Sequence, residues 1–149
     1  MTEIRFYHLQ RQSLEQVLPQ ILLKVIERDW RAVVVAGSPE RVEMLTQMLW
    51  AFDPASFLPH GSVRDGYASD QPIWLTAREE NPNQATVLIV TDGVAATNPG
   101  DYTLVCDLFD GNMPEAVVAA RERWRTVKAA GHELTYWQQG ARGGWERKA

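Results

Sequence analysis

The 149-residue sequence contains one cysteine, Cys106, so no disulfide can form within the chain. Cys106 lies in the apolar run at residues 102–108, which is typical of a buried structural thiol rather than a reactive one. The start, MTEIRFYHL, lacks a basic segment followed by an apolar one, and no apolar run approaches the roughly 20 residues that cross a bilayer. We therefore expect a cytoplasmic protein without a membrane partner.

A second absence concerns the glycine-rich loops that bind phosphate groups. After the apolar run at residues 32–36 the sequence reads Gly37-Ser38-Pro39-Glu40, with one glycine where a dinucleotide fingerprint has three. Glu40 would also face a phosphate with like charge, and a GxxxxGK motif followed by Ser or Thr occurs nowhere. Nucleotide binding is therefore disfavoured.

Catalytic and metal-binding constellations are missing as well. The histidines His8, His60 and His132 are scattered, and none has the spacing of a metal site. His60 follows Pro59 in an aromatic segment and is interpreted as a structural residue or a surface contact. No GxSxG motif is present, and Cys106 has no basic neighbour to activate it. We expect no cofactor, no metal and no catalytic residue.

One alternative from the enzyme class is kept. The pairs Asp92-Gly93 and Asp110-Gly111 follow predicted strands, where catalytic acids often lie, although turns are the favoured interpretation of both. A Rossmann-like nucleotide-binding protein or enzyme would use the crevice near Gly37 and Asp92, at the carboxyl ends of the strands. Detectable nucleotide binding would support this alternative.

The apolar pattern predicts the fold class. Strands are expected at residues 2–9, 32–36, 72–76, 86–91, 102–108 and 133–138, and helices at residues 13–30, 38–50 and 113–130. Strands that alternate with helices predict an α/β fold, a Rossmann-like three-layer α/β/α sandwich with a mostly parallel sheet. We expect a single domain at residues 1–139, followed by a frayed polar tail at residues 140–149.

The net charge of −4 conceals an uneven distribution. Residues 1–120 carry eight Lys and Arg against sixteen Asp and Glu, whereas residues 121–149 carry seven basic residues against three acidic ones. An acidic body argues against broad nucleic-acid binding, which needs an extended basic face. The basic end suits a small anionic partner, such as an acidic peptide, or is a solvated helix face.

Residues 49–60 form the first of two segments with binding character. They combine Trp50, Phe52 and Phe57 with Pro54 and Pro59, which predicts a rigid apolar protrusion of the kind that anchors protein interfaces. The alternative is that the aromatic rings fold inward over the sheet edge. Exposure is favoured for Phe57, while both alternatives stay open for Trp50. An exposed patch here would also allow weak self-association.

The second segment is the end of the third predicted helix. Arg121, Arg125 and Lys128 have the spacing i, i+4 and i+7, so they share one helix face, and Trp124 lies beside Arg121. The structural alternative is that these cations only stabilise the helix C-terminus. The aromatic ring among them favours a pocket for a carboxylate with an apolar neighbour.

These segments carry a resemblance to the chi subunit family of bacterial DNA polymerase III. The similarity includes Phe6-Tyr7, Trp30, the stretch from Leu49-Trp50 to Pro59-His60, and Ala120-Arg121-Glu122-Arg123 with the aromatic after it. It covers nearly the whole chain, although residues 61–99 correspond only in their strand pattern. The Trp–Pro–Ser-Phe–Pro-His string is the most specific part.

The resemblance implies a non-catalytic adaptor, an accessory subunit of a DNA-directed DNA polymerase. Chi subunits pair with the psi subunit of the clamp loader and bind the acidic C-terminal tail of single-stranded DNA-binding protein, so contact with DNA is indirect. Carried over by position, Arg121 holds the tail carboxylate and Trp124 forms an apolar wall, while Arg125 and Lys128 hold upstream acids. A second set forms the psi interface: Trp50, Phe52, Pro54 and Phe57.

One departure from the family bears on affinity. Some members have a lysine one turn before the key arginine, where this chain has Val117. The tail therefore binds more weakly here, or Arg125 and Lys128 compensate. A third hypothesis is direct binding of single-stranded DNA by the basic, aromatic C-terminal part. The acidic body places this hypothesis last.

Overall fold

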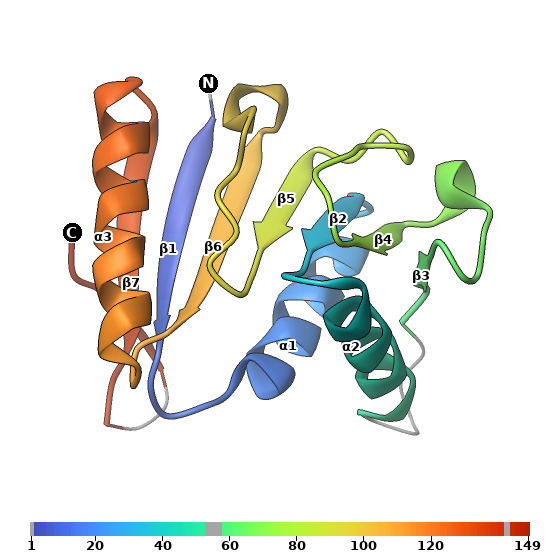
Figure 1. The fold of residues 1–149 in the computed structure, drawn as a ribbon, viewed down its shortest axis with the longest axis horizontal. Coiled ribbons are helices and arrows are strands. Elements are labelled where there is room, and N and C mark those ends of the chain that lie inside the picture. The colour runs from blue at the N-terminus through green and yellow to red at the C-terminus, as the bar shows by residue number, and fades with distance from the viewer. Residues whose placement is uncertain (1, 53–57, 142–143) are drawn as a thin grey trace.

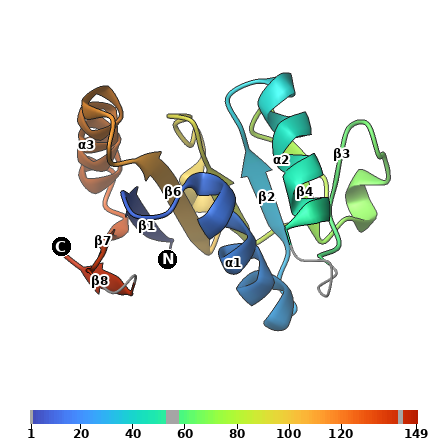
Figure 2. The same cartoon turned by 90° about the horizontal axis from the view of Figure 1, so that it is seen from below.

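The computed structural model describes residues 2–52, 58–141 and 144–149. Within them, eight strands form one sheet in the order β3-β4-β2-β5-β6-β1-β7-β8 (Figures 1 and 2). The elements in chain order are β1 (Glu3–Leu9), α1 (Leu14–Glu27), β2 (Ala32–Val35), α2 (Pro39–Ala51), β3 (Gly61–Ser62), β4 (Ile73–Thr76), β5 (Val87–Val90), β6 (Leu104–Asp110), α3 (Pro114–Ala129), β7 (Glu133–Gln139) and β8 (Trp145–Arg147). Short 3₁₀ turns lie at Ala68–Asp70 and Pro99–Asp101.

The strand pairs confirm the predicted α/β fold with a mostly parallel sheet. Every neighbouring pair is parallel except β7 and β8, which run antiparallel. The central strands β2, β4 and β5 are buried at every position, as expected for short β-branched runs that are covered on both faces.

The helices lie on both faces of the sheet and enclose two cores (Figure 2). Apolar side chains of α1 and α2 pack on one face, against strand residues such as Val34, Ile89 and Leu108. The other face carries α3, whose Ala120, Trp124 and Val127 pack against β-strand side chains. Because α1 follows β1 and α3 follows the neighbouring strand β6, these two connections leave adjacent strands toward opposite faces.

Local chemistry explains where the helices begin and end. Ser38 caps α2 by accepting a hydrogen bond from the Arg41 backbone N–H at 3.2 Å, with Pro39 at the first helical position. Gly131, after α3, has φ +88°, a left-handed conformation that glycine adopts without strain. The expected cap and stop are thus confirmed.

Two strands were not predicted from the sequence. The short edge strand β3 pairs with Trp74 and Leu75 of β4 and lies where the sequence predicts no strand. β8 lies in residues 140–149, which were expected to form a frayed tail. Its Trp145 packs edge-on against Tyr7, with ring centroids 5.0 Å apart. Hydrogen bonding to β7 and this apolar contact together hold β8 on the sheet.

Two further expectations concern Cys106 and membranes. Cys106 is 1% exposed, and burial raises the pKa of its thiol to about 12, which confirms a structural role. Among the helices of the described residues, none combines the length and apolar character that a membrane span requires.

Candidate functional site

The position of α3 on the sheet is fixed by a buried ion pair. Arg123 donates hydrogen bonds to both carboxylate oxygens of Asp107 on β6, from Nε at 2.7 Å and from Nη2 at 3.0 Å. The two side chains are only 11% and 6% exposed. Because Arg123 points into the sheet, the opposite side of α3 is turned outward.

The predicted cation row lies on that outward side. Arg121, Arg125 and Lys128 are all exposed, and the seven residue steps from the first to the last span about 10 Å along the helix. Arg125 forms an exposed ion pair with Glu122. Among the residues that the structure describes, Arg121 and Lys128 make no ion pair with a carboxylate. These two cations are therefore available to an acidic partner.

Trp124 is more buried than expected for a side chain that forms an exposed apolar wall. Its ring is partly buried and packs edge-on against Phe6, with centroids 5.3 Å apart, and against Tyr136 at 5.9 Å. Val117, one turn before Arg121, is also partly buried against the same core. The structure thus places Trp124 and Arg121 on neighbouring positions of α3, with only the outer part of the Trp124 side chain open to a partner.

Two residues beside Arg121 were not predicted from the sequence. His8 on β1 and Tyr136 on β7 form a hydrogen bond between Nδ1 and the phenol oxygen at 2.6 Å. The charge of Arg121 acts on both: it adds to burial in lowering the pKa of His8, and it opposes the rise that burial causes in the pKa of Tyr136. Alternation along the strand places His8 on the face of Phe6, but only the β1–β7 pairing brings Tyr136 beside it.

The predicted aromatic segment is described in part. Trp50, near the end of α2, is 50% exposed, and its ring centroid lies 4.4 Å from that of His60. Phe52 is partly buried against the core beneath α2. Pro54 and Phe57 lie outside the described residues.

His60 is a buried structural residue, so the surface-contact interpretation of its side chain is wrong. It is 4% exposed, and its ring nitrogens face the backbone carbonyl oxygens of Leu58 at 2.6 Å and Thr46 at 3.1 Å. These contacts tie the end of the aromatic segment to α2. A cavity of about 600 Å³ opens between α2 and the β3–β4 edge, and Trp50 is among its lining residues.

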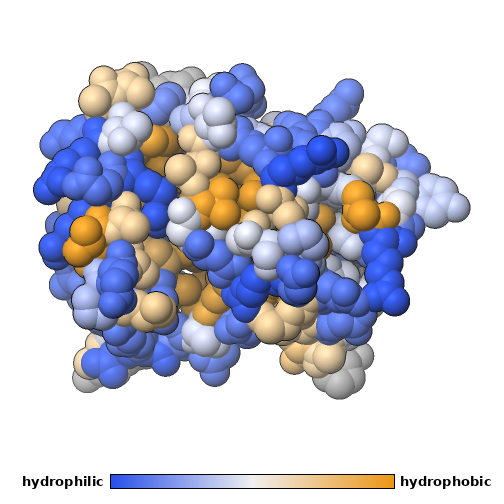
Figure 3. Space-filling view, in the orientation of Figure 1, coloured by the Kyte–Doolittle hydropathy of each residue, from blue (hydrophilic) through white to orange (hydrophobic). Residues whose placement is uncertain are grey.

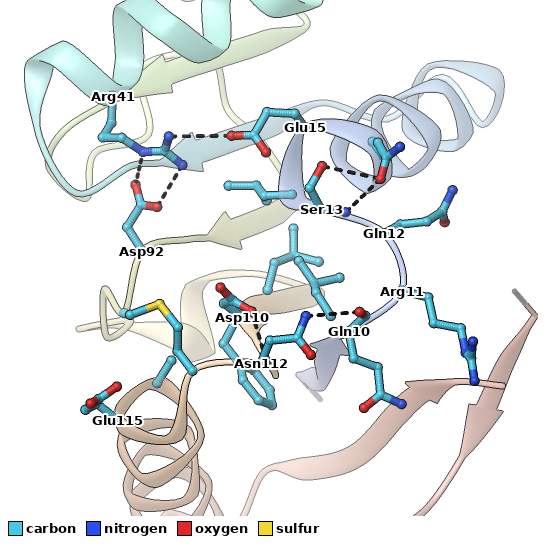
Figure 4. A pocket seen from close by; sticks show the side chains of 18 of the residues that line it. Gln10, Arg11, Gln12, Ser13, Glu15, Arg41, Asp92, Asp110, Asn112 and Glu115 are labelled. Atoms are coloured by element: carbon cyan, nitrogen blue, oxygen red, sulfur yellow. Dashed lines mark hydrogen bonds and ion pairs between the residues drawn. The ribbon is translucent and has the colours of Figure 1, made fainter. Parts of the chain in front are cut away.

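A second large cavity, of about 780 Å³, lies at the carboxyl ends of β1 and β6 (Figure 4). The last residues of these strands and the loops after them supply much of its wall, including Gln10, Arg11, Asp110 and Asn112. Several polar groups in this wall bond to one another. Asn112 donates to the Gln10 carbonyl at 3.0 Å, and the Asn112 N–H donates to Asp110. The bond from the Asn112 N–H to the Asp110 carboxylate is typical of a turn and agrees with the turn interpretation of Asp110.

Asp92 closes the position where a phosphate would be expected. Its carboxylate accepts a hydrogen bond from the Gly37 N–H at 2.9 Å and two from Arg41, each at 3.0 Å. Arg41 also lies 3.6 Å from Glu15. Burial alone would raise the pKa of Asp92, but the bonds from Arg41 and Gly37 outweigh it and hold that pKa below its usual value. A fixed anion thus occupies the start of α2, which disfavours a phosphate there.

A smaller hollow lies on the other side of α3 from the cation row. It measures about 170 Å³ and is lined mainly by apolar side chains, among them Ile4, Val90 and Val127. Figure 3 shows apolar side chains beside α3 and over the central strands, within a largely hydrophilic surface. Among the described residues, no group of three or more His, Cys, Asp or Glu side chains is arranged to hold a metal ion.

The structure defines a three-layer α/β protein with a row of exposed cations on α3 and with the Asp92 carboxylate bonded to the Gly37 N–H at the start of α2. Comparison with protein families gives a more specific result. The family described as DNA polymerase III chi subunit, HolC, matches residues 1–135. The chain belongs to this family, whose members are accessory subunits of DNA polymerase III.

A curated relative supports the same assignment. The chain is 29% identical over 90 residues to the "Probable DNA polymerase III subunit chi" of Rickettsia prowazekii (strain Madrid E). The matched region covers 60% of this chain and 54% of the relative, so the chain spans about half of the length of that protein.

Proposed function

We infer that this chi-family protein is a non-catalytic adaptor that binds the acidic C-terminal tail of single-stranded DNA-binding protein on α3. The single observation that carries the proposal is the exposed pair Arg121 and Lys128, both without a carboxylate partner among the described residues. Arg121 binds the terminal carboxylate, and Lys128 binds an acidic residue upstream. Each charge-assisted hydrogen bond contributes roughly 1.5–3 kcal/mol, so a short tail binds with modest affinity.

The remaining predicted tail residues have unequal roles in this proposal. Trp124 provides an apolar edge beside Arg121, because much of its ring is already packed against Phe6 and Tyr136. Arg125 contributes less than Lys128, since Glu122 already neutralises it. Val117 adds no charge, which keeps the affinity of a single tail low. Several tails on one partner oligomer would raise the effective affinity by avidity.

A second partner, the psi subunit of the clamp loader, is proposed for the aromatic segment. The half-exposed Trp50 next to a cavity of about 600 Å³ supports this, because aromatic anchors beside pockets dominate protein interfaces. Phe52 belongs to the same proposed interface, together with Pro54 and Phe57. Co-purification of a recombinant psi subunit with the protein and with Trp50→Ala tests it: loss of the complex in the variant supports the proposal, and its retention contradicts the role of Trp50.

The tail proposal is tested with a labelled acidic peptide that ends in Pro-Phe. Fluorescence anisotropy compares the free C-terminal carboxylate with the same peptide blocked as a C-terminal amide. We expect saturable binding of the free acid and binding at least about tenfold weaker for the amide, because the amide removes the charge that Arg121 recognises. Equal binding of the two peptides would place the contact elsewhere.

The alternatives are separated by two further ligands. Direct binding of single-stranded DNA predicts saturation with a naked oligonucleotide in the absence of any peptide. A nucleotide-binding protein predicts saturation with a nucleotide, and this binding should be indifferent to Arg121. The adaptor proposal predicts that neither ligand competes with the peptide.

A further inference from the structure

The surroundings of His8 connect the proposed tail site to a titratable group. His8 lies at the carboxyl end of β1, beneath the first half of α3, in a chain of aromatic contacts. Its ring centroid lies 5.2 Å from that of Phe109 and 5.9 Å from that of Tyr136. A Cβ at Gly111 would overlap the His8 ring, so this glycine leaves the space that the ring occupies. The ring is thus held in one place next to Tyr136, whose own ring contacts Trp124 on α3.

Four groups determine the charge of His8. Burial lowers its pKa, a hydrogen bond with the Gly111 backbone raises it, the charge of Arg121 lowers it, and that of Asp110 raises it; the net effect lowers the pKa. Tyr136, from β7, faces Nδ1 as a neutral hydrogen-bonding partner. The lowered pKa favours the neutral imidazole, and the side chain is only partly buried, so water can deliver a proton.

We propose that His8, hydrogen-bonded to Tyr136, forms a proton-linked part of the acidic-tail site, so that a carboxylate bound at Arg121 is held more tightly when His8 is protonated. This rests on the proposed function of α3.

The physical reason is electrostatic linkage. In the free protein, Arg121 opposes a second positive charge on His8. A carboxylate bound at Arg121 removes that opposition and adds an attractive charge, so the pKa of His8 rises in the complex. Binding then takes up a proton, and by linkage acidification strengthens binding. A rise of one pKa unit corresponds to about a tenfold change in affinity between the protonated and neutral states.

The variants separate this linkage from general effects of pH. His8→Gln keeps a polar side chain that cannot be protonated, and Tyr136→Phe keeps the ring but removes the hydroxyl. His132→Gln is the matched control, because His132 precedes β7 at the other end of the sheet and its ring approaches Gly100.

The experiment measures anisotropy of the labelled acidic peptide ending in Pro-Phe at about pH 7.5 and about pH 5.5, at constant ionic strength. We expect roughly threefold to tenfold tighter binding at the lower pH for the unmodified protein and for His132→Gln. For His8→Gln we expect no such increase in affinity at the lower pH. For Tyr136→Phe we expect an increase of a different size. NMR titration of the His8 ring should show a pKa that rises when the peptide saturates the protein.

The outcomes distinguish the two proposals. Saturable binding whose pH response is the same in His8→Gln, or a His8 pKa that saturating peptide leaves unchanged, overturns the inference and leaves the tail site in place. Absence of saturable binding at both pH values overturns the tail site and the linkage together.

Discussion

Arg123 on α3 and Asp107 on β6 form a two-bond ion pair under the helix that carries the proposed tail site. Burial raises the pKa of Asp107, and Arg123 only partly opposes this effect. The pair therefore orients α3, with Arg123 inward and Arg121 outward, rather than serving as a source of large net stability.

Because the ion pair is buried, we expect the single variant to lose much more stability than the double variant. Arg123→Met leaves a buried carboxylate without its partner, which costs about 3–5 kcal/mol of unfolding free energy at neutral pH. The double variant Arg123→Met with Asp107→Leu should recover much of that loss, because it removes the unpaired charge. Urea unfolding measures both. Equal losses in the single and double variants would contradict a charge-based explanation.

The Asp92 carboxylate predicts loss of stability in acid. Its folded-state pKa lies below the unfolded value, so its contribution is present above the unfolded pKa and disappears as pH falls through the folded pKa. Asp92→Asn should therefore be less stable at neutral pH by up to about 1 kcal/mol, because solvent screens a partly exposed carboxylate, and the difference should shrink toward about pH 3. Unfolding measured across this range tests the prediction, and a pH-independent difference contradicts it.

The ordered C-terminal strand predicts that Trp145 stabilises the domain. Trp145→Ala removes the packing on Tyr7 and on the core beneath α1, which should cost about 1–2 kcal/mol for a partly buried ring. The exposed neighbour Arg147, replaced by alanine, is the control and should cost less than about 0.5 kcal/mol. Equal stability of the two variants would show that the packing on Tyr7 contributes nothing.

The exposed pair between Glu122 and Arg125 predicts a gain of function. Glu122→Gln removes a negative charge that repels the acidic peptide, and it frees Arg125 from its ion pair. The peptide should therefore bind about twofold to fivefold tighter. Glu115→Gln, an exposed acid in the first turn of the same helix, changes the net charge equally and should have a smaller effect. The gain should diminish as salt is raised. An equal effect of both variants would mean that only the overall charge matters.

How far the sequence predicts this molecule depends on the range of the interactions. The Val-rich run of β2, the Ser38-Pro39 start of α2 and the Gly131 stop of α3 depend on local chemistry, and each was predicted. The short strands β3 and β8 have weak local patterns. β3 forms because it pairs with β4, and β8 forms because it pairs with β7 and because Trp145 packs on Tyr7.

The proposed site also has features that local sequence predicts and features that depend on packing between distant residues. The row Arg121, Arg125 and Lys128 follows from helical spacing alone, and the structure places all three on the exposed side of α3. The pairing of Arg125 with Glu122 and the half-burial of Trp124 depend on rotamers and on packing across the sheet. The contact between His8 and Tyr136 joins residues 128 positions apart, which only the strand order brings together.

The most direct test of a tail site on α3 is a peptide titration at low salt that compares the unmodified protein, Arg121→Ala and Arg11→Ala. Arg11 is an exposed arginine that lines the crevice at the carboxyl ends of β1 and β6, so it reports on the competing site. We expect saturable binding of the acidic Pro-Phe peptide, at least about tenfold weaker binding by Arg121→Ala, and unchanged binding by Arg11→Ala. Binding that survives in Arg121→Ala and is lost in Arg11→Ala would contradict the site on α3 and place the partner in the crevice.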